Sequence, residues 1–237
     1  MGDPTAYGNF TPCPAIMNAM MEALQSPTAA AGYVNACGTD EARESIANHY
    51  GNVINPDQVI VANGCSGALE IALTSLLDDD TYLLVPCPAF PLYEVIVKSH
   101  GAKISHYNLL HDKGWECDLN HLEQVICDIL KKNNNNKNSI RRPIRGIMIN
   151  NPGNPTGSVF SEEHLIDLLH LSQKYHIPII SDEIYGNLTY YGNAKFQSII
   201  QVASKHQLYT PLIVVSGIGK QFFVPGWRVG WIVFYDK

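Results

Sequence analysis

The segment Ser216-Gly-Ile-Gly-Lys220-Gln-Phe-Phe-Val-Pro-Gly-Trp-Arg228-Val-Gly-Trp231 follows a short apolar run and holds one lysine among small and apolar residues. Apolar surroundings disfavour the charged form of an amine, so the neutral amine forms and can attack a carbonyl carbon. Arg228 carries a planar guanidinium that suits a phosphate. A lysine for an aldehyde and an arginine for a phosphate together suggest pyridoxal 5′-phosphate (PLP), which carries both groups on one ring.

Taken alone, neither residue requires this interpretation. A lone lysine after a β-run is usually a solvated surface residue, and an arginine near Pro-Gly usually lies in a turn. The surrounding chain decides between the two interpretations, because other stretches far away in sequence supply further parts of the same site.

Short, uniformly apolar runs alternate with helical patterns along most of the chain. Strands are expected at 59–61, 82–85, 103–107, 144–149, 177–180, 212–215 and 229–234, and helices at 15–24, 39–50, 67–77, 90–99, 119–131 and 161–175. This alternation predicts an α/β fold with a mainly parallel sheet covered by helices on both faces. Ligands bind beyond the carboxyl ends of such strands, so the polar motifs that follow them should cluster on one edge.

The stretch Asn63-Gly64-Cys65-Ser66 is expected to form a tight turn between a strand and a helix. Small residues there let backbone N–H groups at a helix N-terminus close on an anion, and Ser66 adds a hydroxyl. By itself the signal is weak, because a Gly-Ser turn is more often only a turn.

Asp182 follows an apolar strand, where a bare carboxylate is costly without a positive partner. A protonated pyridine nitrogen is such a partner, and Tyr185 could donate a hydrogen bond to the phenolic oxygen of the same ring. In the rigid run at 151–157, two prolines and two glycines leave Asn154 to project toward that oxygen. The alternatives are a helix N-cap for Asp182, core packing for Tyr185 and a plain surface loop for 151–157.

Three ordered motifs carry a family resemblance. Asn-Pro-Gly-Asn-Pro-Thr-Gly at 151–157, Asp-Glu-Ile-Tyr at 182–185, and Lys220 with the run at 224–231 resemble the class I aminotransferases of PLP fold type I. Gly-Asp-Pro-Thr at 2–5 and the Pro-Gly-Trp-Arg form of the last motif are most similar to the tyrosine aminotransferase branch. The resemblance spans nearly the whole chain and implies the PLP-transferase large-domain fold.

The resemblance implies a role for each motif. Lys220 would form the internal aldimine with PLP and then move the proton between the substrate α-carbon and the cofactor. Asp182 would pair with the pyridine nitrogen, while Asn154 and Tyr185 hold the ring oxygen. The remaining cofactor contacts would come from an aromatic stacked on the ring and from the phosphate ligands: Phe90, Arg228, Cys65 and Ser66.

Two further positions follow from the same resemblance. Tyr33 matches a tyrosine that reaches the phosphate of the neighbouring subunit, which implies a homodimer. Many relatives place a serine three residues before the lysine, whereas here Gly217 occupies that position and Ser216 lies one step earlier. Ser216 is therefore a candidate phosphate ligand that departs from the family pattern.

The expected organisation is an N-terminal segment at 1–40 that leads into a PLP-binding large domain at 41–237. By resemblance, the N-terminal arm, the C-terminal small domain and the arginine for the substrate carboxylate lie outside this sequence. The expected reaction is amino transfer from an aromatic, tyrosine-like amino acid to a 2-oxo acid. Two alternatives stay open: a C–S β-lyase of the same fold, which would release pyruvate and ammonia from a cysteine conjugate, and a cofactor-binding chain without turnover.

Composition restricts the partners and the compartment. The 237 residues carry 16 basic and 22 acidic side chains, a net charge of −6 that argues against nucleic acid as the main partner. The six cysteines form no Cys-x-x-Cys pair, which predicts no metal site and reduced thiols in a cytoplasmic protein. Neither a signal peptide nor a membrane-spanning run is expected. The asparagine-rich run at 133–138 is expected to be a solvated surface insertion.

Overall fold

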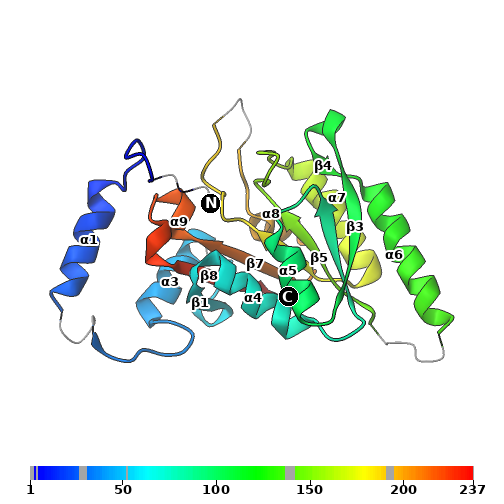
Figure 1. Cartoon of the computed structure of the whole chain (residues 1–237), viewed down its shortest axis with the longest axis horizontal. Coiled ribbons are helices and arrows are strands. Elements are labelled where there is room, and N and C mark those ends of the chain that lie inside the picture. The colour runs from blue at the N-terminus through cyan, green and yellow to red at the C-terminus, as the bar shows by residue number, and fades with distance from the viewer. Residues whose placement is uncertain are drawn as a thin grey trace.

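The computed structural model describes residues 3, 5–26, 31–51, 53–136, 142–190 and 195–236. An eight-stranded sheet has the order β1-β8-β7-β6-β5-β2-β3-β4. The strands are β1 (Val59–Asn63), β2 (Tyr82–Cys87), β3 (Lys103–Leu110), β4 (Glu116–Cys117), β5 (Ile144–Asn150), β6 (Ile179–Asp182), β7 (Leu212–Gly217) and β8 (Val229–Tyr235). Figure 1 shows the sheet running through the middle of the molecule.

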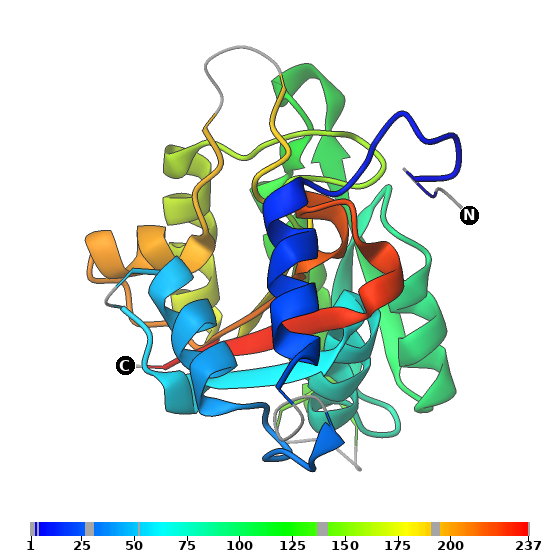
Figure 2. The same cartoon turned by 90° about the vertical axis from the view of Figure 1, so that its left-hand side faces the viewer.

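The centre of the sheet is parallel, as the alternation of strands and helices predicts. Strands β3, β2, β5, β6 and β7 pair in parallel, whereas β8 is antiparallel to both β7 and β1. Figure 2 shows β8 (red) beside β1 (cyan). Residues on these strands are apolar and buried because helices cover both faces.

One face of the sheet is covered by α4 (Gly64–Leu76) and α5 (Leu92–Ser99). Their apolar side chains form a cluster with alternate residues of the strands, including Met148, Ile180, Val215 and Ile232. The residues between these, such as Ile179 and Val214, point to the opposite face. Because side chains alternate along a strand, neighbouring residues at a strand end also face opposite sides.

The opposite face is covered by α3 (Asp40–His49), α6 (Leu119–Asn134), α7 (Glu162–Tyr175) and α8 (Ile199–Lys205). Side-chain caps define where all four of these helices begin: Thr39, Asp118, Ser161 and Ser198 each accept a hydrogen bond from the first turn. The predicted starts of α3 and α7 are therefore confirmed. In contrast, α1 (Pro14–Leu24) has no buried residue and stands apart from the sheet in Figure 1.

Several boundaries differ from the expectations. The predicted turn at 63–66 is wrong, because α4 already begins at Gly64, whose φ of +69° lets the chain leave β1 and enter the helix at once. Helix α6 continues to Asn134, so the asparagine-rich run begins as helix, while residues 137 and 138 lie outside the described part, as do Gly2 and Pro4. Strand β4, helix α8 and the short helix α9 (Ile218–Gln221) are not among the predicted elements, although Ser198 and Gln201 form a capping box at the start of α8.

Candidate cofactor site

The carboxyl ends of β5, β6 and β7 lie side by side. Asn150 at the end of β5 pairs with Asp182 at the end of β6, and Asp182 pairs with Val215 near the end of β7. The run at 151–157 leaves from the first of these ends, and α9, which carries Lys220, leaves from the last. The sheet thus brings three distant motifs to one edge, as the position of each motif after a strand predicts.

Asp182 is buried, with 3% of its surface exposed, and its carboxylate is held by three donors. The Tyr93 hydroxyl donates to Oδ2 over 2.7 Å, the Cys65 thiol to Oδ1 over 3.5 Å and the Ile184 backbone N–H to Oδ1 over 3.2 Å. Burial raises the pKa of Asp182, and the hydrogen bonds from Tyr93, Ile184 and Cys65 oppose that rise. Asp182 is not a helix N-cap, because it ends β6 and its carboxylate faces α4 and α5.

The N-terminus of α4 is open to an anion. Its N-cap residue, Asn63, makes no side-chain capping bond, so among the described residues no side chain caps this first turn. The Arg228 guanidinium lies against the same turn, with Nη2 3.4 Å from the Asn63 carbonyl oxygen. A Cβ on Gly64 would fall 2.4 Å from Nη2, so glycine is what allows this approach. A guanidinium beside free N–H groups and the exposed Ser66 forms an anion cradle.

Tyr185 and Asn154 flank this arrangement. Burial, followed by the neighbouring Asp182 carboxylate and the Cys65 thiol, raises the pKa of Tyr185, which places its ring near both groups. The backbone N–H of Asn154 donates to Asn150 Oδ1 over 2.6 Å, which fixes the loop to β5. Asn150 in turn donates through Nδ2 to the Asp182 carbonyl oxygen over 2.9 Å. The half-buried Asn154 is thereby tied to the strand end that carries Asp182.

Lys220 is half-buried in α9. The N-terminal segment lies close to it: Asp3 has a lowered pKa, caused by hydrogen bonds from the Thr5 hydroxyl and N–H and also by the charge of Lys220. The Phe10 ring stacks on Phe223, just past α9, with 5.2 Å between ring centroids. Asp3 and Phe10 therefore lie near α9, which carries the lysine.

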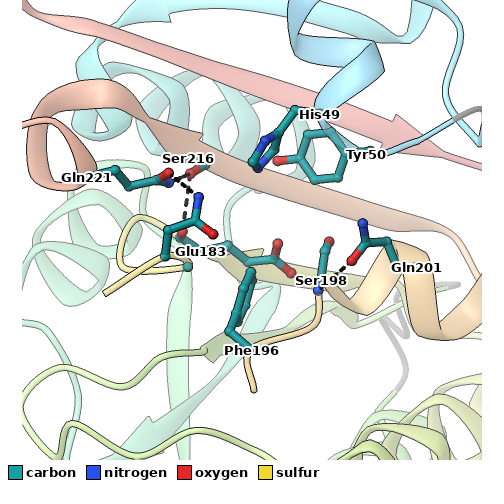
Figure 3. A pocket seen from close by; sticks show the side chains of 10 residues that line it. His49, Tyr50, Glu183, Phe196, Ser198, Gln201, Ser216 and Gln221 are labelled. Carbon is teal, nitrogen blue, oxygen red and sulfur yellow. Dashed lines mark hydrogen bonds between the residues drawn. The ribbon is translucent and has the colours of Figure 1, made fainter. Parts of the chain in front are cut away.

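Ser216 is placed differently from the other candidates. It follows Val215 on β7 and faces the opposite side of the sheet, where its hydroxyl donates to the Glu183 carbonyl oxygen over 3.1 Å and accepts from Gln221. Figure 3 shows it in a cavity of about 220 Å³ with Tyr50 and Glu183. Because strand residues alternate between faces, the serine one step earlier than the family position turns away from the α4 cradle. The structure thus contradicts the expectation that Ser216 binds phosphate.

The last two predicted residues, Phe90 and Tyr33, differ in exposure. Phe90 is half-buried and contacts Tyr93 edge to face, with 5.8 Å between ring centroids. The Tyr33 side chain is fully exposed. The structure therefore brings Phe90 into the neighbourhood of Asp182 through Tyr93, but it does not bring Tyr33 there.

Sequence reasoning missed Tyr93 and Glu183. Tyr93 lies three residues after Phe90, a spacing that puts both on one side of a helical turn, but its partner Asp182 is 89 positions away. Glu183 is as buried as Asp182, accepts from the Ser181 hydroxyl and the Ile199 N–H, and has a pKa raised to about 7 by burial. Only the sheet register reveals either contact.

The residues present fit PLP. Among the described residues, none of the side chains that donate to the buried Asp182 carboxylate is cationic, so this carboxylate suits a protonated ring nitrogen. The α4 cradle with Arg228 suits a phosphate, and Lys220 lies at the end of the neighbouring strand. An acid, an anion cradle and an amine at one sheet edge match the three polar ends of this cofactor.

The whole chain, residues 1–237, matches the family model for aminotransferase class I and II. The chain therefore belongs to the class I and II aminotransferase family. Within that family it is 36% identical to the tyrosine aminotransferase of Dictyostelium discoideum, over 100% of this chain and 53% of that protein. Human tyrosine aminotransferase is 35% identical over 100% of this chain and 48% of its own length.

Solved structures give the same result for the fold. Tyrosine aminotransferase from Leishmania infantum superposes with a TM-score of 0.80 at 29% identity, covering 100% of this chain and 61% of that one. An aminotransferase from Escherichia coli gives a TM-score of 0.85 at 28% identity, covering 100% and 54%. The chain spans about half the length of the curated relatives it matches. Its fold is that of the aminotransferase large domain, an α/β sheet covered on both faces.

Proposed function

We propose that residues 41–237 form the PLP-binding large domain of an aminotransferase that moves an amino group from an aromatic amino acid to a 2-oxo acid. The observation that carries this proposal is the buried Asp182 carboxylate at the sheet edge, next to the α4 cradle. Burying a carboxylate at the ligand-binding edge of such a sheet is costly unless a positive group pairs with it.

Bound PLP supplies an aldehyde for an amine and a ring that withdraws electrons from the substrate α-carbon. In this proposal, Asp182 holds a proton at the ring nitrogen by opposing charge. Tyr185 and Asn154 donate hydrogen bonds to the ring oxygen, and Phe90 packs on the ring face. Arg228 and the first turn of α4, with Cys65 and Ser66, bind the phosphate.

Lys220 carries the chemical step in this proposal. Its Nζ would accept the proton of the substrate α-carbon and could later donate it again, so that one group would act as both base and acid. Lys220 is half-buried in α9, and the Phe10 ring stacks on Phe223 just past that helix.

The proposed substrate class rests on the relatives. Two of them, at 35–36% identity, are named tyrosine aminotransferase.

Among the described residues, no helix combines the length and the hydropathy needed to cross a bilayer. All six cysteines are free thiols, which supports a cytoplasmic location for the proposed enzyme.

The test is titration of the chain with PLP, followed by visible absorbance. A band is expected with the wild-type chain and is expected to be absent with Lys220→Ala, while the control Lys205→Ala, which removes a lysine from α8, keeps it. L-tyrosine is expected to convert the band at least ten times faster than L-aspartate. A band that persists without Lys220, or equal rates with the two amino acids, would refute the lysine assignment or the substrate class respectively.

We also propose that two copies of the chain associate. Helix α1 exposes an apolar stripe of Met17, Met21 and Leu24, and Tyr33 beyond it is fully exposed. An apolar helix face without a partner fits coverage by a second copy. Light scattering is expected to give twice the chain mass for the wild type and the control Glu22→Gln, and the single mass for Met21→Glu. A monomeric wild-type chain would contradict the proposal.

A further inference from the structure

Asp182 is held by side chains from two different helices. Tyr93 belongs to α5 and Cys65 to the first turn of α4, and their donors reach opposite oxygens of the carboxylate, Oδ2 and Oδ1. Together with the Ile184 N–H on Oδ1, these donors hold both oxygens and fix the rotation of the carboxylate plane. Neither side chain is among the groups assigned to the pyridine nitrogen.

Tyr93 makes a second contact that concerns the same ring. Its side chain is fully buried, and it meets the Phe90 ring edge to face at 5.8 Å between centroids. Phe90 is the residue proposed to pack on the cofactor face. Tyr93 therefore touches both the residue at the ring edge and the residue at the ring face.

Cys65 links Asp182 to the first turn of α4. Its backbone N–H belongs to the α4 turn that faces Arg228, and its thiol donates to Asp182. Burial, together with the Asp182 charge, raises the pKa of the Cys65 thiol and keeps it protonated as a donor. Burial and Asp182 likewise raise the pKa of Tyr93, so both groups stay donors over the whole neutral range.

We propose that Tyr93 and Cys65 are positioning residues that clamp the Asp182 carboxylate in one orientation and keep it negatively charged. The same two residues fix the position of the carboxylate relative to Phe90 and the α4 cradle. This inference rests on the proposed function, because that function pairs the Asp182 carboxylate with the ring nitrogen. The physical basis is that a donor bonded to a carboxylate stabilises its charged form and opposes the effect of burial. Hydrogen bonds to charged groups are about twice as strong as those between neutral ones.

The first experiment needs no cofactor. The chain is labelled with ¹³C at aspartate side-chain carbons, and the Asp182 signal, assigned by its loss in Asp182→Asn, is titrated with pH. Tyr93→Phe keeps the ring against Phe90 and removes only the hydroxyl, so Asp182 is expected to become about a tenfold weaker acid. Cys65→Ala is expected to weaken it about threefold, and Cys65→Ser, which keeps a donor, is expected to stay near wild type.

The matched control is Tyr107→Phe. Tyr107 is also fully buried and donates a 2.7 Å hydrogen bond, but to the Met148 carbonyl oxygen on the other face of the sheet. Its loss is expected to leave the Asp182 titration unchanged. An unchanged midpoint in Tyr93→Phe, or an equal shift in Tyr107→Phe, overturns the role of Tyr93. Equal behaviour of Cys65→Ser and Cys65→Ala overturns the role of the thiol donor.

The second experiment is a double-mutant cycle on PLP affinity. Tyr93→Phe is expected to weaken PLP binding about tenfold in the wild-type background and less than twofold in Asp182→Asn, because its effect passes through the carboxylate. Equal losses in both backgrounds show that Tyr93 does not act through Asp182 and overturn the clamp. If wild-type chain gives no Lys220-dependent band, the proposed function fails, while the cofactor-free titration still decides whether the clamp exists.

Discussion

Asp182 and Glu183 are adjacent buried carboxylates whose side chains face opposite sides of the sheet. Asp182 turns toward α4 and α5, where Tyr93 and Cys65 donate hydrogen bonds to its carboxylate. Glu183 turns toward α8, where it accepts hydrogen bonds from the Ser181 hydroxyl and the Ile199 N–H, and it borders the cavity of Figure 3. Two adjacent carboxyl groups thus face different partners: the α4 and α5 side chains on one side of the sheet and the start of α8 on the other.

This difference shows that the register of β6, and not the degree of burial, decides which partners the Asp182 and Glu183 carboxylates meet. Each residue is 3% exposed, and burial raises the pKa of both. What differs is the surroundings: anion cradle and lysine on one side, a helix N-terminus on the other. The contrast can be tested on each face in turn.

The largest effect is expected from Asp182→Asn. It removes the charge opposite the ring nitrogen, so the rate at which L-tyrosine converts the PLP-loaded chain is expected to fall at least about 100-fold. Glu183→Gln, measured in the same stopped-flow assay, is expected to stay within about threefold. Comparable losses in the two variants would break the distinction between the faces.

The next effect is the pH dependence of stability, and it concerns Glu183. Burial raises its pKa to about 7, well above that of an exposed glutamate, so the folded chain keeps a proton that the unfolded chain releases. The free energy of unfolding is therefore expected to fall as pH rises from about 4.5 through 7, by an amount on the order of 3 kcal/mol. Glu183→Gln should remove most of this slope and be the more stable protein at pH 8.

The measurement is the urea midpoint at several pH values between 5 and 8. The control is Glu94→Gln: Glu94 lies on the surface of α5, paired with Lys98, and hydrogen bonding to Lys98 lowers its pKa out of this window. It is expected to leave the slope unchanged. A wild-type slope that survives in Glu183→Gln would mean that another group binds the proton.

A smaller effect is expected from Gly64→Ala on the Asp182 side. The new Cβ would lie 2.4 Å from Arg228 Nη2, and the positive φ of 69° strains alanine. PLP affinity is expected to fall about tenfold, with a loss of about 1 kcal/mol in stability. Gly226→Ala, where no atom lies within 4 Å, is the matched control. Unchanged affinity in Gly64→Ala would show that Arg228 does not contact the phosphate.

The smallest effect separates the two serines. Ser66 lies in the α4 turn, and Ser66→Ala is expected to weaken PLP binding about fivefold by loss of one hydrogen bond. Ser216→Ala is expected to change it less than twofold, because the hydroxyl faces the Glu183 side. Equilibrium titration of both variants decides the matter. A larger loss in Ser216→Ala would restore Ser216 as a phosphate ligand.

The sequence alone determined the architecture and the grouping of motifs. Alternating apolar runs specify a parallel sheet, and motifs that follow strands must meet at its carboxyl edge, so Asp182 and Lys220 could be placed together without coordinates. Only the tertiary structure decided which face each side chain takes. Ser216 shows this, because a shift of one residue along a strand reverses the side of the sheet, and uniformly apolar runs do not encode that register. Tyr93 and Cys65 reach Asp182 only through the packing of α5 and α4 against the sheet.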